Sequence, residues 1–177
     1  MKFHETQIAG VWLIEPVRFE DARGFFSRTW SRALFAERGL RTDLEQSSLS
    51  FNPHVGTLRG MHYQIKPNEE AKLVRCTRGA IYDVVVDLRP ESPTYCGWTA
   101  AELTAENHRL FYIPEGCAHG LLTLAENTEV FYQIAGLYSP ECYRGVRWND
   151  PAFKIRWPAE VRVIADRDRD YADYQKV

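Results

Sequence analysis

Short apolar stretches alternate with turn residues along most of the chain. We expect strands where hydrophobic, β-branched and aromatic residues gather between breaks, and those breaks include Pro53, Pro67, Gly79, Pro90 and Pro114. The expected strands cover residues 11–14, 25–30, 44–51, 56–64, 72–77, 80–88, 97–103, 110–113, 120–124 and 128–134. One helix is expected, capped by Ser31 and ending at Gly39. The pattern therefore predicts an all-β protein with few, short helices.

Many short strands favour a β-sandwich or a small barrel over alternating βαβ units, and a double-sheet jelly roll fits best. A length of 177 residues with 45% hydrophobic residues suits one domain spanning residues 1–177. A jelly roll has a mouth lined by inward-facing side chains, so polar residues at inward positions of strands need an explanation. The candidates are His62, Lys72, His119 and Tyr132.

The stretch Gly-Thr-Leu-Arg-Gly-Met-His-Tyr-Gln at 56–64 places a histidine and an arginine in a strand-like run. Strict alternation would put Arg59 on one face and His62 with Gln64 on the other. Gly60 carries no side chain, which leaves room for a ligand or another backbone beside His62. A lone histidine on a strand is more often part of the core, so the other polar candidates decide between the two interpretations.

Charge and cysteine content narrow the possible partners. The formal net charge is −2 and the basic residues are spread along the chain, so we expect neither nucleic-acid nor membrane binding. The four cysteines lie far apart without a C-x-x-C pair, and the first residues contain no apolar segment. We therefore expect reduced thiols and a cytoplasmic protein.

Jelly-roll barrels of the cupin type commonly bind a metal through histidines and a glutamate, and half of that pattern is present. Gly56 precedes His62 by six residues, and the segment from Pro114 to His119 resembles the second half. A metal-binding cupin would have a second imidazole where this chain has Gln64, and an amide oxygen is a poor ligand for a transition metal. Glu69 has nearly the carboxylate spacing but lies in the polar loop 66–70, where a solvated charge is expected. We predict a site without metal.

Histidine, lysine and tyrosine in one metal-free pocket suit proton transfer next to a carbonyl group. A histidine can accept the proton from carbon, an ammonium group can stabilise the enolate oxygen, and a tyrosine can return a proton. Each residue also has a structural interpretation, since Lys72 could extend from a strand edge and Tyr132 could belong to the core or its rim. The alternating charges of residues 166–170 are typical of a solvated segment.

Several separate motifs resemble the dTDP-4-dehydrorhamnose 3,5-epimerase family of cupin-fold enzymes from about Val11 to Asp168. They are Asp21-x-Arg23-Gly24-x-Phe26, Leu58-Arg59-Gly60-Met61-His62-Tyr63-Gln64, Lys72-Leu73-Val74-Arg75 with Gly79 and Val86-Asp87-Leu88-Arg89, Ile113-Pro114-Glu115-Gly116-x-Ala118-His119-Gly120, and Arg147-Trp148-Asn149-Asp150-Pro151. The resemblance implies a double-stranded β-helix and a cofactor-independent isomerase.

The resemblance also implies roles for matching residues. His62 resembles the general base, Asp168 the carboxylate that orients it, Tyr132 the general acid and Lys72 the group facing the C4 oxygen of the sugar. This replaces the solvated interpretation of the segment around Asp168. The expected substrate contacts are the sugar-pocket residue His119, the diphosphate and nucleotide contacts Arg23, Arg59 and Arg167, the base platform Tyr138, and Phe26 supplied by a partner subunit. A homodimer that binds a nucleotide-diphosphate sugar is therefore implied.

The chain departs from the family pattern mainly at the nucleotide end. Gln46-Ser47-Ser48 stands where Gln-Asp-Asn is usual, while Arg28 and Tyr143 replace glutamates. We keep Gln46, Ser48, Arg28 and Tyr143 as candidate substrate contacts. The expected reaction is epimerisation of an NDP-4-keto-6-deoxyhexose, most simply dTDP-4-dehydro-6-deoxyglucose at C3 and C5. Alternatives are inversion at one carbon, a 3,4-ketoisomerase, or a cupin that only binds a sugar nucleotide.

Overall fold

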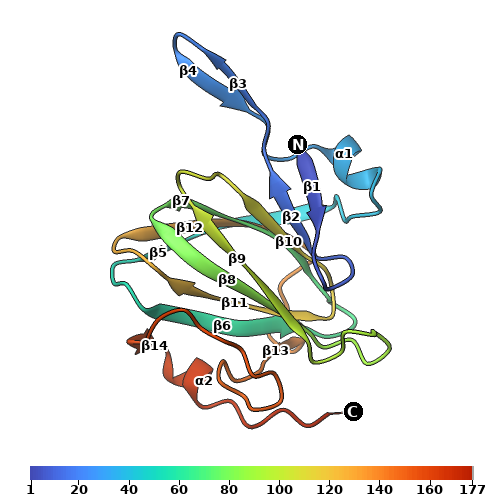
Figure 1. Cartoon of the computed structure of the whole chain (residues 1–177). Helices are drawn as coiled ribbons and strands as arrows, with labels where there is room; N and C mark the ends of the chain where they lie inside the picture. The colour runs from blue at the N-terminus through green and yellow to red at the C-terminus, as the bar shows by residue number, and fades with distance from the viewer. Residues whose placement is uncertain (177) are drawn as a thin grey trace.

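Two antiparallel sheets face each other in a computed structural model that describes residues 1–176 (Figure 1). The first sheet has the order β1-β2-β10-β7-β12-β5 and the second β13-β6-β11-β8-β9, with β14 pairing in parallel with β6. The strands are β1 Lys2–Glu5, β2 Trp12–Glu15, β3 Arg18–Asp21, β4 Gly24–Ser27, β5 Leu44–Asn52, β6 Thr57–Gln64, β7 Ala71–Arg78, β8 Ala80–Asp87, β9 Trp98–Thr104, β10 Leu110–Ile113, β11 Cys117–Thr123, β12 Thr128–Ala135, β13 Tyr143–Gly145 and β14 Val163–Ile164; the helices are α1 Arg32–Ala36 and α2 Asp166–Arg169. The predicted jelly roll with short helices is confirmed.

Most predicted strands are present within one or two residues of their expected ends. The expected strand at 25–30 is wrong beyond Ser27, because Trp30 instead packs on Phe35 of α1 with their ring centroids 6.3 Å apart. Helix α1 is shorter than expected, and the Ser31 side chain makes no capping hydrogen bond. The pattern missed β1, β3, β13, β14 and α2, which are short or polar, and the first three residues of β11. The four missed strands depend on pairing with β2, β4 or β6 rather than on a local periodic signal.

Apolar side chains fill one part of the space between the sheets. Their centre is formed by Val74, Val85, Phe111 and Val130, all essentially inaccessible to solvent. Two further clusters lie on the outer faces, one around Phe35 of α1 and one beneath the loops after β8 and β13. The remaining space between the sheets is lined by polar side chains and forms the cavity described below.

Strand β6 does not keep the alternation that its sequence suggests. His119 of β11 pairs with His62, but Leu121 pairs with Arg59, so the register shifts by one residue between these pairs. Such a shift redirects the side chains on one side of it. Arg59 and His62 consequently line the same cavity, which corrects the prediction that they lie on opposite faces.

Gly60 is needed at that irregularity. Its φ is +115°, and a Cβ atom there would lie 2.6 Å from the Cα of Gly120. The space left by the missing side chain is therefore filled by the backbone of β11. Of the two possibilities weighed for Gly60, a neighbouring backbone is correct.

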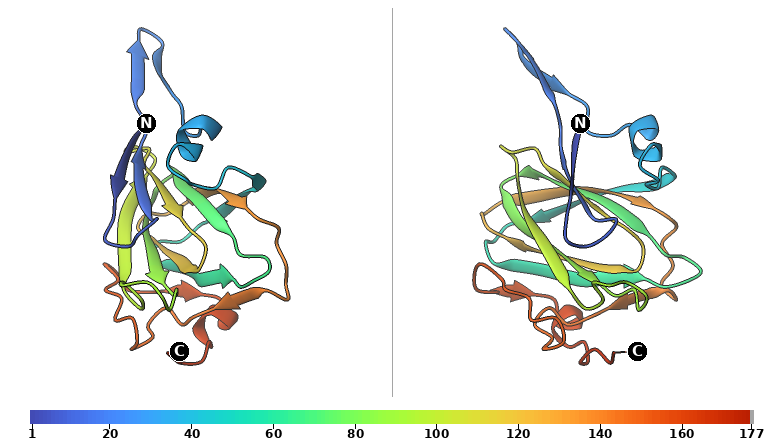
Figure 2. Two further views of the ribbon diagram at one scale, coloured as in Figure 1. Left: turned by 90° about the vertical axis from the view of Figure 1, so that its right-hand side faces the viewer. Right: turned by 45° about the vertical axis from the view of Figure 1, so that its right-hand side comes forward.

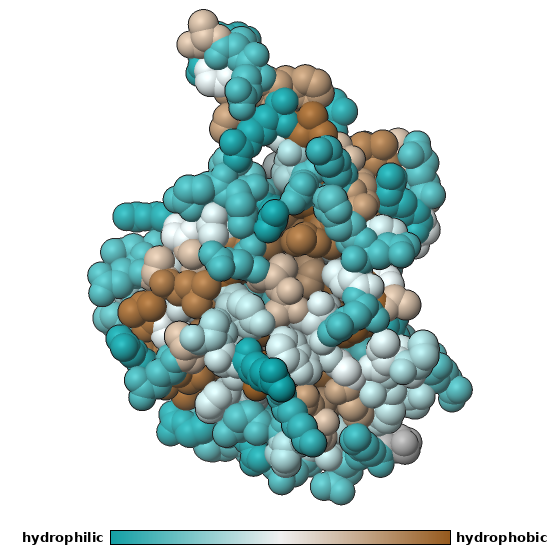
Figure 3. All heavy atoms as spheres, viewed as in Figure 1, coloured by the Kyte–Doolittle hydropathy of each residue, from teal (hydrophilic) through white to brown (hydrophobic). Residues whose placement is uncertain are grey.

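The β3–β4 hairpin stands clear of the barrel (Figures 1 and 2). In the space-filling view it carries apolar side chains among hydrophilic ones, away from the body of the molecule (Figure 3). Phe19 and Phe26 are 64% and 63% exposed. Side chains of this kind on a projecting hairpin are typical of a contact surface rather than of a core.

The C-terminal residues return to the outside of β6. Strand β14 pairs with Thr57 and Leu58, and α2 follows directly beside the same strand (Figure 1). This route places a segment distant in sequence next to His62. Among the described residues, no helix has the length and apolar character that crossing a bilayer requires.

Candidate active site

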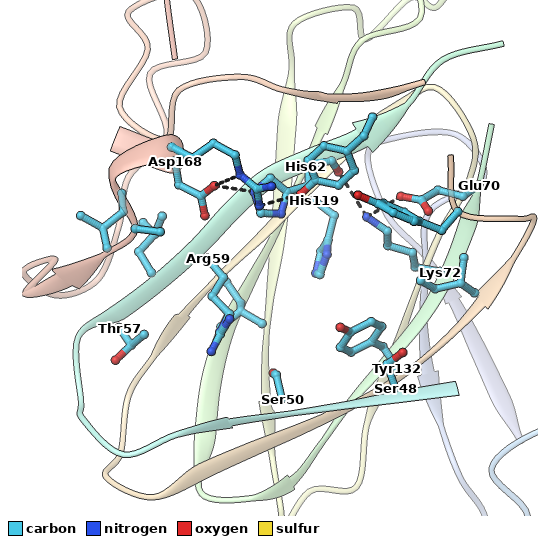
Figure 4. Close-up of a pocket in the computed structure, with 18 of the residues that line it drawn as sticks. Ser48, Ser50, Thr57, Arg59, His62, Glu70, Lys72, His119, Tyr132 and Asp168 are labelled. Atoms are coloured by element: carbon cyan, nitrogen blue, oxygen red, sulfur yellow. Dashed lines mark hydrogen bonds and ion pairs between the residues drawn. The ribbon is translucent and has the colours of Figure 1, made fainter. Parts of the chain in front are cut away.

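A cavity of about 620 Å³ opens between the two sheets, and polar side chains from both sheets and from the C-terminal segment converge on it (Figure 4). Its volume is in the range of small-molecule sites. Its lining includes Gln46, Ser48, Ser50, Arg59, His62, Glu70, Lys72, His119, Tyr132, Tyr138, Tyr143, Arg167 and Asp168. Most residues proposed from the sequence are thus brought together, and the exceptions lie on or just after the β3–β4 hairpin.

His62 and Asp168 form a close pair at one wall of the cavity. The Nε2 atom of His62 lies 2.7 Å from Oδ1 of Asp168, and the other carboxylate oxygen accepts the Gly60 N–H at 3.0 Å. Asp168 is only 3% exposed. A carboxylate held on both oxygens fixes the ring orientation of the histidine and leaves Nδ1 available to a ligand.

Burial lowers the pKa of His62, and the hydrogen bond and charge of Asp168 oppose this only in part. Lys72 and Arg167 lower it further. For Asp168, burial would raise the pKa, but the bonds from His62 and from the Gly60 N–H outweigh it, so the pKa falls below its usual value. The pair at neutral pH is therefore a neutral imidazole beside an ionised carboxylate, which is the state a general base requires.

Lys72 is held by Glu70, a residue that the sequence interpretation missed. Its Nζ atom lies 2.9 Å from Oε1 of Glu70 and donates to the His62 carbonyl oxygen at 3.3 Å. Glu70 is 8% exposed, so the expectation of a solvated charge in the loop 66–70 is wrong for this residue. The signal was available, because Glu70 precedes Lys72 by two residues and strand alternation places both on one face.

Gln64 connects this ion pair to the loop that carries Tyr138. Its amide nitrogen donates to Glu70 at 3.2 Å and to the Leu137 carbonyl at 3.1 Å, while its oxygen accepts the Ser139 N–H at 2.7 Å. Gln64, at the position of the second histidine in a metal-binding cupin, thus bonds to the backbone on both sides of Tyr138. Within residues 1–176, no three His, Cys, Asp or Glu side chains gather as a ligand set.

His119 has a carboxylate partner of its own, which the sequence interpretation did not find. Nε2 of His119 lies 2.7 Å from Oδ1 of Asp83, and Asp83 is completely buried. His119 faces His62 directly across β11 and β6. An aspartate within the apolar strand 80–87 was the available signal, since a charge in such a run needs a partner.

Tyr132 approaches the cavity from the sheet opposite His62. It lies on β12, pairs with Ser48 on β5, and projects from the wall that also carries Ser50 (Figure 4). His62 and Asp168 lie on the other side of the cavity in the same view (Figure 4). A ligand between the two walls can therefore be reached by the imidazole and the phenol from opposite directions.

Aromatic and basic side chains form the outer part of the cavity. The Arg167 guanidinium lies 4.9 Å above the Tyr143 ring and donates to its hydroxyl at 3.3 Å, and Tyr138 meets the Tyr143 ring edge-on at 5.9 Å. Burial raises the pKa of Tyr143, so the phenol stays neutral. Arg59 is steadied by Asn52, which accepts its Nε–H at 2.7 Å. These cations and ring faces can bind a diphosphate and a base.

Three of the proposed contacts, Arg23, Phe26 and Arg28, lie on or just after the projecting hairpin and do not line this cavity. The Arg23 side chain is 90% exposed and pairs with Asp21 of the same hairpin. Within one chain, these residues therefore lie outside the site.

A jelly-roll barrel with a His–Asp pair, a lysine and a tyrosine around one cavity defines a cupin-type enzyme of the acid–base class. Residues 5–176 match the family profile described as dTDP-4-dehydrorhamnose 3,5-epimerase. The chain belongs to this family and is an isomerase, as the sequence motifs predicted.

Individual proteins support the same assignment. The chain is 43% identical over 169 residues to the dTDP-4-dehydrorhamnose 3,5-epimerase of Sinorhizobium fredii, covering 95% of this chain and 87% of that protein. The crystal structure of the Bacillus anthracis enzyme, with TDP and PPi bound, superimposes with a TM-score of 0.93 at 38% identity over 98% of this chain and 99% of that one. The Legionella pneumophila enzyme, in complex with dTDP-4-keto-L-rhamnose, gives a TM-score of 0.88 at 34% identity over 94% and 89%.

Proposed function

We propose that this protein epimerises dTDP-4-dehydro-6-deoxyglucose at C3 and C5. The observation that carries the proposal is the placement of the His62–Asp168 pair and Tyr132 on opposite walls of one cavity, with Lys72 nearby. Inversion at carbon requires removal of a proton from one face and delivery to the other, and this arrangement supplies both groups. The ligands TDP and dTDP-4-keto-L-rhamnose in the related structures support a thymidine-diphosphate sugar as substrate.

His62 acts as the base in this proposal. It removes the proton from a carbon next to the C4 ketone, and the electron pair of that C–H bond moves to the ketone oxygen. Asp168 stabilises the imidazolium that forms. The ammonium group of Lys72, with its pairing to Glu70, stabilises the enolate oxygen.

Tyr132 completes the inversion. Its hydroxyl donates a proton to the enolate carbon from the side opposite His62, and solvent then restores the protonation states of both residues. The same groups act at the second carbon after the sugar reorients its ring. His119, held by Asp83, borders the sugar between them.

The nucleotide lies in the outer part of the cavity in this proposal. Arg59 and Arg167 bind the diphosphate, Tyr138 and Tyr143 provide ring faces for the base, and Gln46 and Ser48 supply polar contacts. The projecting hairpin supports a homodimer in which Arg23, Phe26 and Arg28 of one subunit reach the site of the other, because their own cavity is out of reach. We place the enzyme in the cytoplasm, in keeping with four cysteines that are all free thiols.

Proton NMR of dTDP-4-keto-6-deoxyglucose with the protein in deuterated water tests the proposed function. We expect deuterium to enter at C3 and C5 and both centres to invert. His62→Ala should slow exchange by about 10²–10⁴-fold, because it removes the proton acceptor.

Each other outcome identifies one of the alternatives. Exchange and inversion at one carbon would indicate a single-centre epimerase, and movement of the keto group would indicate a ketoisomerase. Binding without any exchange would make the protein a sugar-nucleotide-binding cupin. Exchange that survives intact in His62→Ala would assign the base to another residue.

A further inference from the structure

The Arg147–Pro151 motif stands outside the cavity, although it is one of the sequence features that mark the family. It follows β13, and β13 pairs directly with the strand that carries His62. Gly145 lies opposite His62, and Val146 and Met61 exchange two backbone hydrogen bonds of 3.3 and 3.0 Å. The start of the motif is thus fixed to β6 next to the proposed base.

The same motif contacts the C-terminal tail, which we define as residues 165–176. Asp150 is 1% exposed, and its Oδ2 atom accepts the backbone N–H of Tyr174 at 2.6 Å. Its other oxygen accepts the Ala152 N–H at 2.8 Å, which fixes the carboxylate itself. Arg147 forms an ion pair with Asp173. Two charged residues of the motif therefore bind two consecutive residues of the tail.

Aromatic packing reinforces these polar contacts. The Tyr174 ring lies 5.2 Å from Phe153, and its hydroxyl is 2.9 Å from that of Tyr95. Tyr171 lies over Gly145, where an added Cβ would come within 2.1 Å of the tyrosine ring. Glycine at 145 is thus required for the tail to lie against β13. We call Gly145, Arg147 and Asp150 the clamp.

Asp168 lies between two attachments of its segment to the barrel. On the N-terminal side, β14 pairs with Thr57 and Leu58 of β6. On the C-terminal side, the clamp holds residues 171–174. Both attachments are anchored to β6, the strand that carries His62, because β14 and β13 each pair with it. Together they set the position of the Asp168 carboxylate relative to the His62 imidazole.

We propose that the clamp positions Asp168 against His62 by fixing the C-terminal tail to the segment that is paired with β6. Arg147 and Asp150 are positioning residues in this proposal, which rests on the proposed role of His62 as the base. Release of the tail would leave the two sheets and the cavity walls that they form in place, but would allow Asp168 and its neighbour Arg167 to move away from the imidazole.

Asp150→Asn is the direct test, because the amide keeps the size of the side chain but removes one of its two acceptor oxygens. Tyr174→Ala weakens the attachment from the tail side, because it removes the ring packed on Phe153 and the hydroxyl contact with Tyr95 while keeping the backbone N–H that Asp150 accepts. Asp168→Asn serves as the reference for a lost carboxylate. Asp166→Asn is the matched control, since this tail carboxylate is exposed and, among residues 1–176, pairs only with Arg169.

The first measurement is an NMR titration of His62 without substrate. The charged and titratable groups facing it are Asp168, Arg167, Lys72, His119, Tyr143 and Tyr171. Asp150→Asn and Tyr174→Ala should move the His62 pKa away from its wild-type value and, as in Asp168→Asn, remove the downfield Nε2 proton signal of its hydrogen bond, because the carboxylate has moved away. The control should leave the titration unchanged. An unaltered His62 titration in both folded clamp variants would overturn the proposal.

The second measurement is the turnover of the proposed substrate. We expect Asp150→Asn to lower kcat by about 10- to 100-fold, because the imidazole loses its fixed carboxylate, with a smaller rise in KM, because the tail also carries the proposed diphosphate contact Arg167. The double variant Asp150→Asn/Asp168→Asn should be no slower than Asp168→Asn alone. Additive losses, or a loss confined to KM, would show that the motif does not act through Asp168. If the wild-type protein does not turn over 4-keto nucleotide sugars, the proposed function fails, whereas the titration still decides the clamp.

Discussion

Charged side chains around the cavity and on the β3–β4 hairpin differ in their burial and in their ion-pair partners. Inside the barrel, His62 pairs with Asp168, His119 with Asp83 and Lys72 with Glu70, each within 2.9 Å and each with a buried carboxylate. On the hairpin, the Arg23 side chain is 90% exposed, and its one ion-pair partner in the described part of the chain is the nearby Asp21. A single chain therefore holds all of the proposed proton-transfer groups, whereas part of its expected nucleotide site faces solvent.

This difference matches the proposed mechanism, in which the buried groups transfer protons and the exposed groups bind the nucleotide. Groups that move protons must keep fixed distances and shifted pKa values, and burial with an internal partner provides both. Groups that grip a diphosphate and a base need only complementary charge and a ring face, so a second subunit can supply them. The following predictions test whether the two regions separate in this way.

The largest contrast should come from two tyrosines. Tyr132→Phe should lower product formation by about 10²–10⁴-fold while deuterium exchange continues, because enolate formation precedes the proton donation that the phenol serves. Tyr138→Ala should mainly raise KM, by about 5- to 100-fold, since stacking on a base is binding energy already present in the ground state. Tyr138→Phe keeps the ring face and serves as the control.

Combined NMR exchange and steady-state kinetics distinguish these two effects. The two roles would have to be exchanged if Tyr138→Phe blocked inversion while Tyr132→Phe changed only KM. Proton transfer could then no longer be assigned to the inner part of the cavity and base binding to the outer part.

Asp168→Asn should lower kcat by roughly 10²-fold, because the imidazole loses its orienting carboxylate. A base must be unprotonated, so kcat/KM rises with pH through the His62 pKa, which lies below its ordinary value. Asp168 raises that pKa and Arg167 lowers it. The acidic limb of the profile should therefore move to lower pH in Asp168→Asn and to higher pH in Arg167→Gln.

A pH profile of kcat/KM for both variants, with Asp166→Asn as control, provides the measurement. Shifts in the same direction would mean that His62 does not produce the acidic limb.

Mixing two inactive variants tests the hairpin. His62→Ala lacks the base, and Arg23→Ala/Phe26→Ala lacks the hairpin contacts. If the hairpin serves the partner subunit, one of the two sites in each heterodimer contains both intact parts. Random exchange of subunits should then restore roughly a quarter of the wild-type activity.

Activity of the mixture after subunit exchange, followed at substrate concentrations below KM, gives the answer. A mixture no more active than its components, despite heterodimers seen by native mass spectrometry, would mean that the hairpin serves its own subunit.

The smallest effect is expected from a chelator. Gln64 donates to Glu70 and to the Tyr138 loop, while the two histidines each pair with a carboxylate. Incubation with EDTA followed by gel filtration should leave kcat and KM unchanged in the NMR assay. Loss of activity that a divalent ion restores would contradict a site without metal.

The sequence by itself determined the class of fold and much of the cavity. Alternating apolar runs between prolines and glycines indicated most of the strands, because side-chain periodicity is a local property of a β-strand. The stretch 56–64 identified His62, and Gln64 at the position of the second histidine of metal-binding cupins led to the prediction of a site without metal. The role of Asp168 came from the resemblance to a family, since its charged surroundings alone suggested a solvated segment.

Only the tertiary structure decided how distant residues meet. Strict alternation along β6 would have pointed Arg59 away from the cavity, but a one-residue register shift between β6 and β11 turns its side chain into it. The register between two strands cannot be read from the local pattern of either strand. Asp83 and Asp168 reach their histidines across 36 and 106 residues, respectively, through pairing of β8 with β11 and through the tail that returns to β6. Periodicity specifies which face a side chain occupies within one strand. Which partner it meets depends on long-range strand pairing and on the burial that this pairing creates.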